Sequence, residues 1–225
     1  ANALLSDIEK KHFQARTQSE LDYFSLFNKS GFDNSYPIFL KKGEINKQEV
    51  VQKVISLNPD LLVCFGTSIV KSELLQIYHR RFINVHLGIS PHYRGSGTNV
   101  WPLINYEPHM VGATFMHIDT GIDTGEIIHQ IAADIFIGDS PHSIGNRLIS
   151  KMTRTYRDLI VNFDYLERIP QLKCDFERVY RARDFNEKAC VTLYDNFKKG
   201  MIYDFLDKNL RIPLAINPRI SSCGH

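Results

Sequence analysis

Three polar residues in the middle of the chain, Asn84, His86 and Asp123, are of types that can do chemistry together. Asn84 and His86 are two residues apart at the end of a predicted strand, so their side chains point the same way. A carboxamide donates a hydrogen bond without changing its charge, and an imidazolium donates one while positively charged. Together they can stabilise a developing oxyanion. A carboxylate beside His86 would raise the pKa of the imidazole and keep it protonated, and it could accept a proton from an attacking amine.

Each of these residues also has an ordinary structural interpretation. An isolated Asn-x-His at a strand end more often caps or packs, and an Asp in a glycine-flanked loop usually forms a turn. His92 and His117 fit polar surface or satisfied interior positions. No histidine pair has zinc-site spacing, so no metal is predicted. Residues 94–97 lack the Lys-Ser/Thr ending of a phosphate-binding loop.

The elements around these residues predict an α/β fold with a mainly parallel, Rossmann-like sheet. Residues 61–65 and 82–86 are apolar runs, typical of strands buried on both faces. A helix at 46–57, with Asn46 and Glu49 as a capping box, precedes the first strand, and a helix at about 72–78 separates the two. This alternation predicts parallel strands whose carboxyl ends form the site, at residues 66–68 and 86–88.

The remaining elements are predicted on either side of this core. Residues 4–27 favour one or two helices, 28–37 a loop and 38–40 a short strand. Downstream we expect a short helix at 98–105, strands at 111–118 and 126–132, and a helix from Asp139 or Ser140, with Pro141 inside it, to about 166. A strand at 176–180 and helices over 186–206, broken near Gly200, follow. We therefore predict a catalytic domain over 1–168 and a small, mostly helical C-terminal extension over 169–225.

Composition argues against several function classes. The formal net charge of +2 over 225 residues gives no electrostatic footprint for nucleic acid or an anionic membrane. No apolar run is long enough for a membrane span. The four cysteines form no C-x-x-C pair and indicate a reducing compartment, so a cytoplasmic location is predicted. They are Cys64, Cys174, Cys190 and Cys223.

The order and spacing of the motifs resemble the folate-dependent formyltransferase family. This family includes glycinamide ribonucleotide transformylase, methionyl-tRNA formyltransferase and the sugar-nucleotide N-formyltransferases. The matching motifs are Asn84-Val85-His86, Pro91, Arg94-Gly95 and the Asp-Thr-Gly-Ile-Asp-Thr-Gly loop at 119–125. The resemblance covers about residues 46–166.

The resemblance implies an N-formyltransferase that uses 10-formyltetrahydrofolate as donor and no metal. It implies that Asn84 and protonated His86 stabilise the oxyanion, and that Asp123 supports His86 and receives the amine proton, directly or through water. The pterin would lie against the backbone of two loops. Their implied cofactor-binding residues are Phe65, Gly66, Thr67, Ile118, Asp119 and Gly121.

Two departures from the family pattern bear on the acceptor. Leu87-Gly88-Ile89-Ser90 stands where many members have Pro-Ser-Leu-Leu, so the contacts of this loop do not carry over. Family domains begin with a strand, a helix and a second strand, and no such opening is found before Leu4. The sheet is therefore expected to lack its usual first strands, and acceptor residues upstream are not assigned.

The predicted acceptor is a primary amine on a small molecule, with an amino-sugar nucleotide favoured. Residues 170–225 hold ten Lys or Arg against seven Asp or Glu and are too few for the usual basic domain that binds tRNA, so no nucleic-acid partner is expected. Homo-oligomerisation stays open. A formyltetrahydrofolate hydrolase and a non-catalytic folate-binding or interaction module remain alternatives. The lack of G-x-G-x-x-G argues against a generic nucleotide-binding domain.

Overall fold

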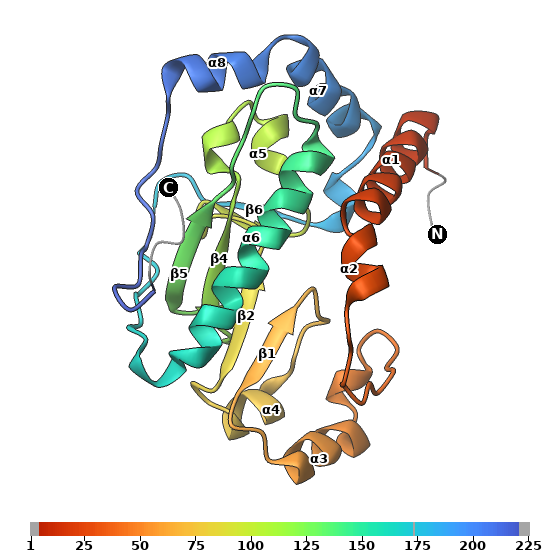
Figure 1. Cartoon of the computed structure of the whole chain (residues 1–225). Helices are drawn as coiled ribbons and strands as arrows, with labels where there is room; N and C mark the ends of the chain where they lie inside the picture. The colour runs from red at the N-terminus through yellow and green to blue at the C-terminus, as the bar shows by residue number, and fades with distance from the viewer. Residues whose placement is uncertain (1–4, 173, 221–225) are drawn as a thin grey trace.

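A four-stranded sheet forms the centre of the computed structural model, which describes residues 5–172 and 174–220. The strands lie in the order β1 (Leu62–Phe65), β2 (Phe82–His86), β4 (Gly112–His117) and β5 (Ile127–Ala132), as Figure 1 shows. β1 and β2 are parallel, whereas β2–β4 and β4–β5 are antiparallel. The predicted α/β class and the parallel helical crossover are confirmed. The β4–β5 pair can be antiparallel because β4 turns directly into β5 through a loop, without a crossover helix.

The helices flank this sheet, and α6 runs along one of its faces (Figure 1). The α-helices are α1 (Asp7–Tyr23), α2 (Ser25–Ser30), α3 (Gln48–Leu57), α4 (Ser72–Ile77), α5 (Trp101–Ile104), α6 (Pro141–Val161), α7 (Glu187–Lys198) and α8 (Met201–Lys208). Short 3-10 helices are η1 (Glu44–Asn46), η2 (Pro108–Met110), η3 (Phe163–Tyr165) and η4 (Ala182–Asp184). The predicted break near Gly200 is confirmed, since this residue separates α7 from α8 with a φ of 88°.

The main core lies between the sheet, α6 and the C-terminal helices. Phe115 and Ile128 of the sheet and Leu148 of α6 are fully buried, and Leu193 of α7 and Met201 of α8 join the same cluster. Burying each such side chain contributes about 1.5–3 kcal/mol. The C-terminal residues therefore help to hold the sheet that carries the predicted site. The division at residues 168 and 169 stays a prediction.

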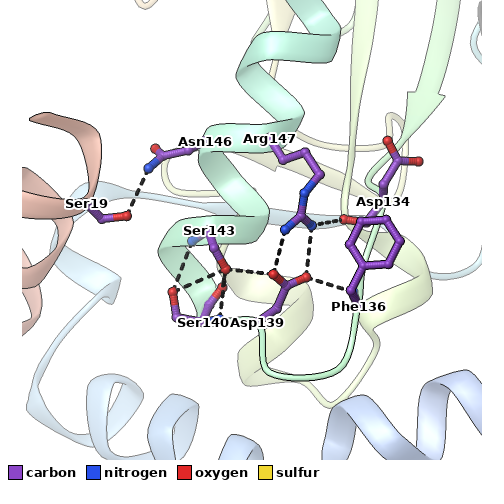
Figure 2. A network of polar contacts seen from close by, with 8 residues as sticks. All are labelled: Ser19, Asp134, Phe136, Asp139, Ser140, Ser143, Asn146 and Arg147. Carbon is purple, nitrogen blue, oxygen red and sulfur yellow. Dashed lines mark hydrogen bonds and ion pairs between the residues drawn. The ribbon is translucent and has the colours of Figure 1, made fainter. Parts of the chain in front are cut away.

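The start of α6 is fixed by a polar network (Figure 2). Ser140 accepts a backbone N–H of the first turn, and Arg147 binds both carboxylate oxygens of Asp139 at 2.6 and 2.9 Å. Burial raises the pKa of Asp139, but the hydrogen bond from Arg147 and two others outweigh it, so the pKa is lowered. Next to Arg147, Asn146 donates to the Ser19 hydroxyl at 3.0 Å and ties α6 to α1.

Two predictions about strands are wrong: the burial of β1 on both faces and the short strand at residues 38–40. β1 forms where expected, but Val63 is 45 % and Phe65 is 48 % exposed, so the strand is not buried on both faces. β1 is the edge of the described sheet, and the two exposed residues share one of its faces. Residues 38–40 form no strand, and Phe39 is almost fully exposed. An apolar run in the sequence indicates that the segment tends to be buried. It does not show which other element would cover the segment.

Asn46 does not cap α3, so the predicted capping box is wrong. The helix begins at Gln48, with Lys47 at the N-cap position and no side-chain cap. Asn46 instead donates to the Ile69 carbonyl at 2.9 Å and accepts the Lys71 N–H at 2.7 Å. It therefore holds the loop that follows β1.

A second, two-stranded sheet brings the C-terminal extension to the end of β2. β3 (Tyr93–Gly95) pairs in parallel with β6 (Arg178–Tyr180), and Trp101 stacks on Tyr180 with 4.0 Å between ring centroids. β6 lies within the predicted strand at 176–180, whereas β3 was not predicted.

Residue 4, where a predicted helix begins, and Cys223 lie outside the described residues. Of the helices that the structure describes, none has both the length and the apolar character that crossing a membrane requires.

Candidate active site

The structure brings His86 and Asp123 into contact. His86 is the last residue of β2, and its Nδ1 lies 3.3 Å from Oδ2 of Asp123. The two side chains are only 7 % and 14 % exposed. β4 runs antiparallel to β2, so the loop after β4 leaves near the start of β2 and must return along it for Asp123 to reach His86. Asn84, on the same strand as His86, lines a cavity together with Asp123.

Both ring nitrogens of His86 are engaged. Nε2 lies 2.9 Å from the Tyr93 carbonyl oxygen and 3.2 Å from the Thr98 hydroxyl. A carbonyl can only accept, so the ring proton is assigned to Nε2, which donates to Tyr93. Nδ1 then faces the Asp123 carboxylate.

Opposing influences act on the pKa of His86, so the positive charge expected for it stays a prediction. Burial is the largest influence and lowers the pKa of His86, and Arg94 lowers it further. Asp123 and the Tyr93 carbonyl raise the pKa, but by less. Desolvation penalises the imidazolium more than one carboxylate favours it. The pair can therefore share a proton between Nδ1 and Oδ2.

Asp123 is held in an unusual backbone conformation. Its φ of 53° lies in the left-handed region, which Asp tolerates better than most residues but which still costs energy. The Gly95 N–H donates to its Oδ2 at 2.8 Å, and the Gln171 side chain donates to its carbonyl at 3.0 Å. Gly95 itself has a φ of 92°, and a Cβ there would lie 2.1 Å from the Tyr180 carbonyl oxygen. The Arg-Gly motif thus needs glycine for the β3–β6 pairing.

Two glycines of the 119–125 loop are required by close approach. A Cβ at Gly121 would lie 1.9 Å from the Thr124 hydroxyl, and one at Gly125 would lie 1.8 Å from the His117 carbonyl oxygen. The Asp119 carboxylate accepts from the Gly121 N–H at 2.9 Å and from the Thr124 hydroxyl at 2.8 Å. Asp119 therefore organises the loop from within.

A cavity of about 150 Å³ lies beside this loop. Four of the six residues predicted to hold the pterin line it: Thr67, Ile118, Asp119 and Gly121. Phe65 and Gly66, at the end of β1, lie outside the lining.

The chemistry of this cavity suits a flat ring that carries amide groups. Val70 and Met116 give it apolar walls. His117 is also among the residues that line it, and burial lowers the pKa of this histidine to about 4. Backbone groups of the loop supply further donors and acceptors. Among the described residues, no three His, Cys, Asp or Glu side chains are grouped as a metal site requires.

A larger cavity, of about 730 Å³, lies between β5, α6 and residues 205–220. It contains none of the predicted site residues. We place the candidate active site at the smaller cavity, because Asn84 and Asp123 both line it and His86 contacts Asp123.

Sequence reasoning missed several residues around His86 and Asp123. Thr98 and the Tyr93 carbonyl contact His86, and Gln171 contacts the Asp123 loop. Thr98 and Tyr93 lie close to the recognised motifs, but no local pattern marks their contacts. Gln171 lies 48 residues beyond Asp123 in the sequence, so only the fold brings them together.

Comparison with known proteins gives a consistent result. A sequence profile described as formyl transferase matches residues 3–160, more than two thirds of the chain. The methionyl-tRNA formyltransferase of Geobacter metallireducens is 36 % identical over 111 residues, covering 48 % of this chain and 35 % of the relative. The enzyme of that name from Citrifermentans bemidjiense is 33 % identical over 184 residues, covering 76 % of this chain and 57 % of the relative. The chain thus spans between a third and three fifths of these two relatives' length.

Solved structures share the fold. The formyltransferase PseJ from Anoxybacillus kamchatkensis, in complex with a UDP-linked formamido sugar and tetrahydrofolate, superimposes with a TM-score of 0.55 at 23 % identity, over 73 % of this chain and 80 % of that one. Phosphoribosylglycinamide formyltransferase from Anaplasma phagocytophilum gives 0.53 at 15 % identity, over 75 % and 93 %. At these identities the likeness concerns the fold.

Proposed function

We propose that this chain, which belongs to the formyl transferase family, moves a formyl group from 10-formyltetrahydrofolate to a primary amine of a small acceptor. The observation that carries the proposal is the buried contact between His86 and Asp123 at 3.3 Å, beside the cavity that Asn84 lines. A carboxamide donor and a proton-accepting pair are the two functions that acyl transfer to an amine requires.

Each of the three residues has a distinct role in this proposal. The Asn84 carboxamide donates to the formyl oxygen as it gains negative charge during attack by the amine. Asp123 takes the proton that the amine releases and shares it with Nδ1 of His86. His86 becomes cationic at that moment and helps to balance the new negative charge from its buried position. The proton then passes to the departing nitrogen of the folate, which leaves as tetrahydrofolate.

The cavity beside the loop would hold the donor. Thr67, Ile118 and Gly121 would contact the pterin. Phe65 and Gly66, at the adjoining end of β1, are kept as secondary candidates. Asp119 would act by shaping the loop, because its carboxylate is already hydrogen-bonded within it.

An amino-sugar nucleotide is the first acceptor to test, and the PseJ structure with its bound formamido sugar nucleotide supports that choice at the level of the fold. Methionyl-tRNA is the second candidate, because the sequence relatives carry that name. A net charge of +2 offers little long-range attraction for a polyanion, which favours the small acceptor.

The experiment is a screen of acceptors with 10-formyltetrahydrofolate. Amino-sugar nucleotides, glycinamide ribonucleotide and methionyl-tRNA are incubated with the chain, and mass spectrometry reports gain of one formyl group. Formate released without an acceptor would indicate a hydrolase on the same scaffold. Folate binding with neither product would indicate a non-catalytic module and would overturn the proposal.

A further inference from the structure

Gln171 lies on a well-anchored part of the C-terminal extension. Two residues before it, Ile169 exchanges two backbone hydrogen bonds with Ile127 at the start of β5, at 2.7 and 2.8 Å. Further along, Glu177 pairs with Arg94 of β3. The extension is therefore fixed on both sides of Gln171 against elements that surround the candidate active site.

The Gln171 side chain holds the backbone of the Asp123 loop. Its Nε2 donates to the carbonyl oxygens of Asp123, at 3.0 Å, and Gly125, at 2.7 Å. Carbonyls only accept, so this orientation of the amide is the one that makes both bonds. Its Oε1 is buried and has no partner among the described residues. The Gln171 side chain makes both donated hydrogen bonds although this leaves its Oε1 buried without a partner in the described part of the chain. We infer that the two donated bonds determine the orientation of the amide.

Asp123 needs such support. Its left-handed backbone costs energy for any residue with a side chain, and such conformations persist where the surroundings hold them. The Gly95 N–H and His86 hold the carboxylate end of the residue. Gln171 holds the carbonyl end. Without it, the peptide after Asp123 is free to rotate and to carry the carboxylate away from His86.

We propose that Gln171 is a positioning residue for Asp123, through which the C-terminal extension sets the contact between Asp123 and His86. The expected loss of turnover in a Gln171 variant rests on the proposed formyl transfer. The expected change in the contact between Asp123 and His86 does not. The C-terminal extension is then a part of the catalytic unit, because it supplies the side chain that fixes the loop.

Gln171→Met tests the proposal, because it keeps most of the length and volume and removes both donated hydrogen bonds. The same replacement at Gln76, which is exposed on α4, serves as the matched control. With the best acceptor of the screen, we expect kcat to fall about 100-fold in Gln171→Met, the effect typical of a misplacement of about 1 Å, with KM little changed. Gln76→Met should match the parent.

A second readout does not depend on turnover. The pKa of His86 is followed by NMR titration in the parent and in Gln171→Met, with the signal assigned through His86→Gln. The groups facing His86 are Asp123, Arg94, the Tyr93 carbonyl and the Thr98 hydroxyl, and of these only Asp123 should move. Because Asp123 raises the pKa of His86, its withdrawal should lower that pKa in the variant. A purely structural role for Gln171 would lower thermal stability and leave the pKa of His86 unchanged.

The possible results separate the two proposals. If the parent transfers no formyl group, the proposed function fails, and the NMR titration still decides the role of Gln171. A folded Gln171→Met variant with the parent's His86 pKa overturns the positioning role, whatever its melting temperature. Should Gln171→Met fail to fold, Gln171→Asn repeats both measurements, since it keeps the amide but is one methylene shorter. Parent-like values in that variant would equally overturn the proposal.

Discussion

Replacing Gly88 with alanine perturbs the surroundings of His86 without changing any polar group. A Cβ at this position would lie 2.5 Å from Nε2 of His86, 2.7 Å from the Tyr93 carbonyl oxygen and 2.9 Å from Cβ of Thr98. Contacts this short are not tolerated, and the neighbours are a buried ring, a backbone carbonyl and a branched side chain with little room to move. The new methyl group must therefore push His86 away from Tyr93.

The expected cost follows from these contacts. Overpacking a tight interior costs about 1–3 kcal/mol, and losing the 2.9 Å hydrogen bond of His86 costs about 0.5–1.5 kcal/mol more. We therefore expect Gly88→Ala to lower the free energy of unfolding by about 2–4 kcal/mol. A loss of about 3 kcal/mol corresponds to a fall of about 6–12 °C in Tm for a chain of this size. Formyl transfer should fall about 100-fold, because the pair is displaced.

Urea unfolding followed by circular dichroism and a formyl-transfer assay measure the two effects. Gly145→Ala, within α6, is the matched control, because its Cβ would meet only Nδ2 of Asn99, at an ordinary 3.4 Å. In a helix interior that change should stabilise by up to about 1 kcal/mol. The reasoning is refuted if Gly88→Ala unfolds within about 0.5 kcal/mol of the parent, a typical surface effect, and keeps its rate.

Two further predictions concern the scaffold. Tyr156→Phe should lower the free energy of unfolding by about 1–3 kcal/mol, because the hydroxyl donates to the Cys64 and Ile83 carbonyls at 3.0 and 3.1 Å; urea unfolding within error of the parent would contradict this. Burial lowers the pKa of His12 from 6.5 to about 4, so the unfolded state takes up this proton first and stability falls as pH drops from about 6.5 towards 4. Unfolding measured across that range should depend less on pH in His12→Phe, and an unchanged dependence would count against the buried, neutral state of His12.

The sequence predicted most of the elements and the contact at the centre of the site. Asn84, His86 and Asp123 were recognisable because their motifs keep a fixed order and each has a chemical reason for its residue types. Strands β1, β2, β4 and β5 were recognisable because apolar runs bounded by turns are local signals.

What the sequence did not predict depends on distant contacts. The direction of β4 relative to β2 is set by packing, and with it the path of the loop that carries Asp123. The β3–β6 pair and the Gln171 contact join residues about 50 to 85 positions apart, and no local pattern records them. The influences on the pKa of His86 are hidden for a related reason, since the sequence shows a carboxylate partner but not the depth of burial that opposes it.

The most direct test of the proposed chemistry is formyl transfer by Asp123→Asn under single-turnover conditions. The variant and a control, Asp164→Asn on the exposed surface, are first checked for parent-like unfolding and for binding of a folate analogue. Asparagine preserves the shape of Asp123 but cannot accept the amine proton. We expect Asp123→Asn to bind the folate analogue and lose formyl transfer, while Asp164→Asn transfers like the parent. Transfer by Asp123→Asn at a rate near the parent's would contradict the role assigned to the His86–Asp123 pair.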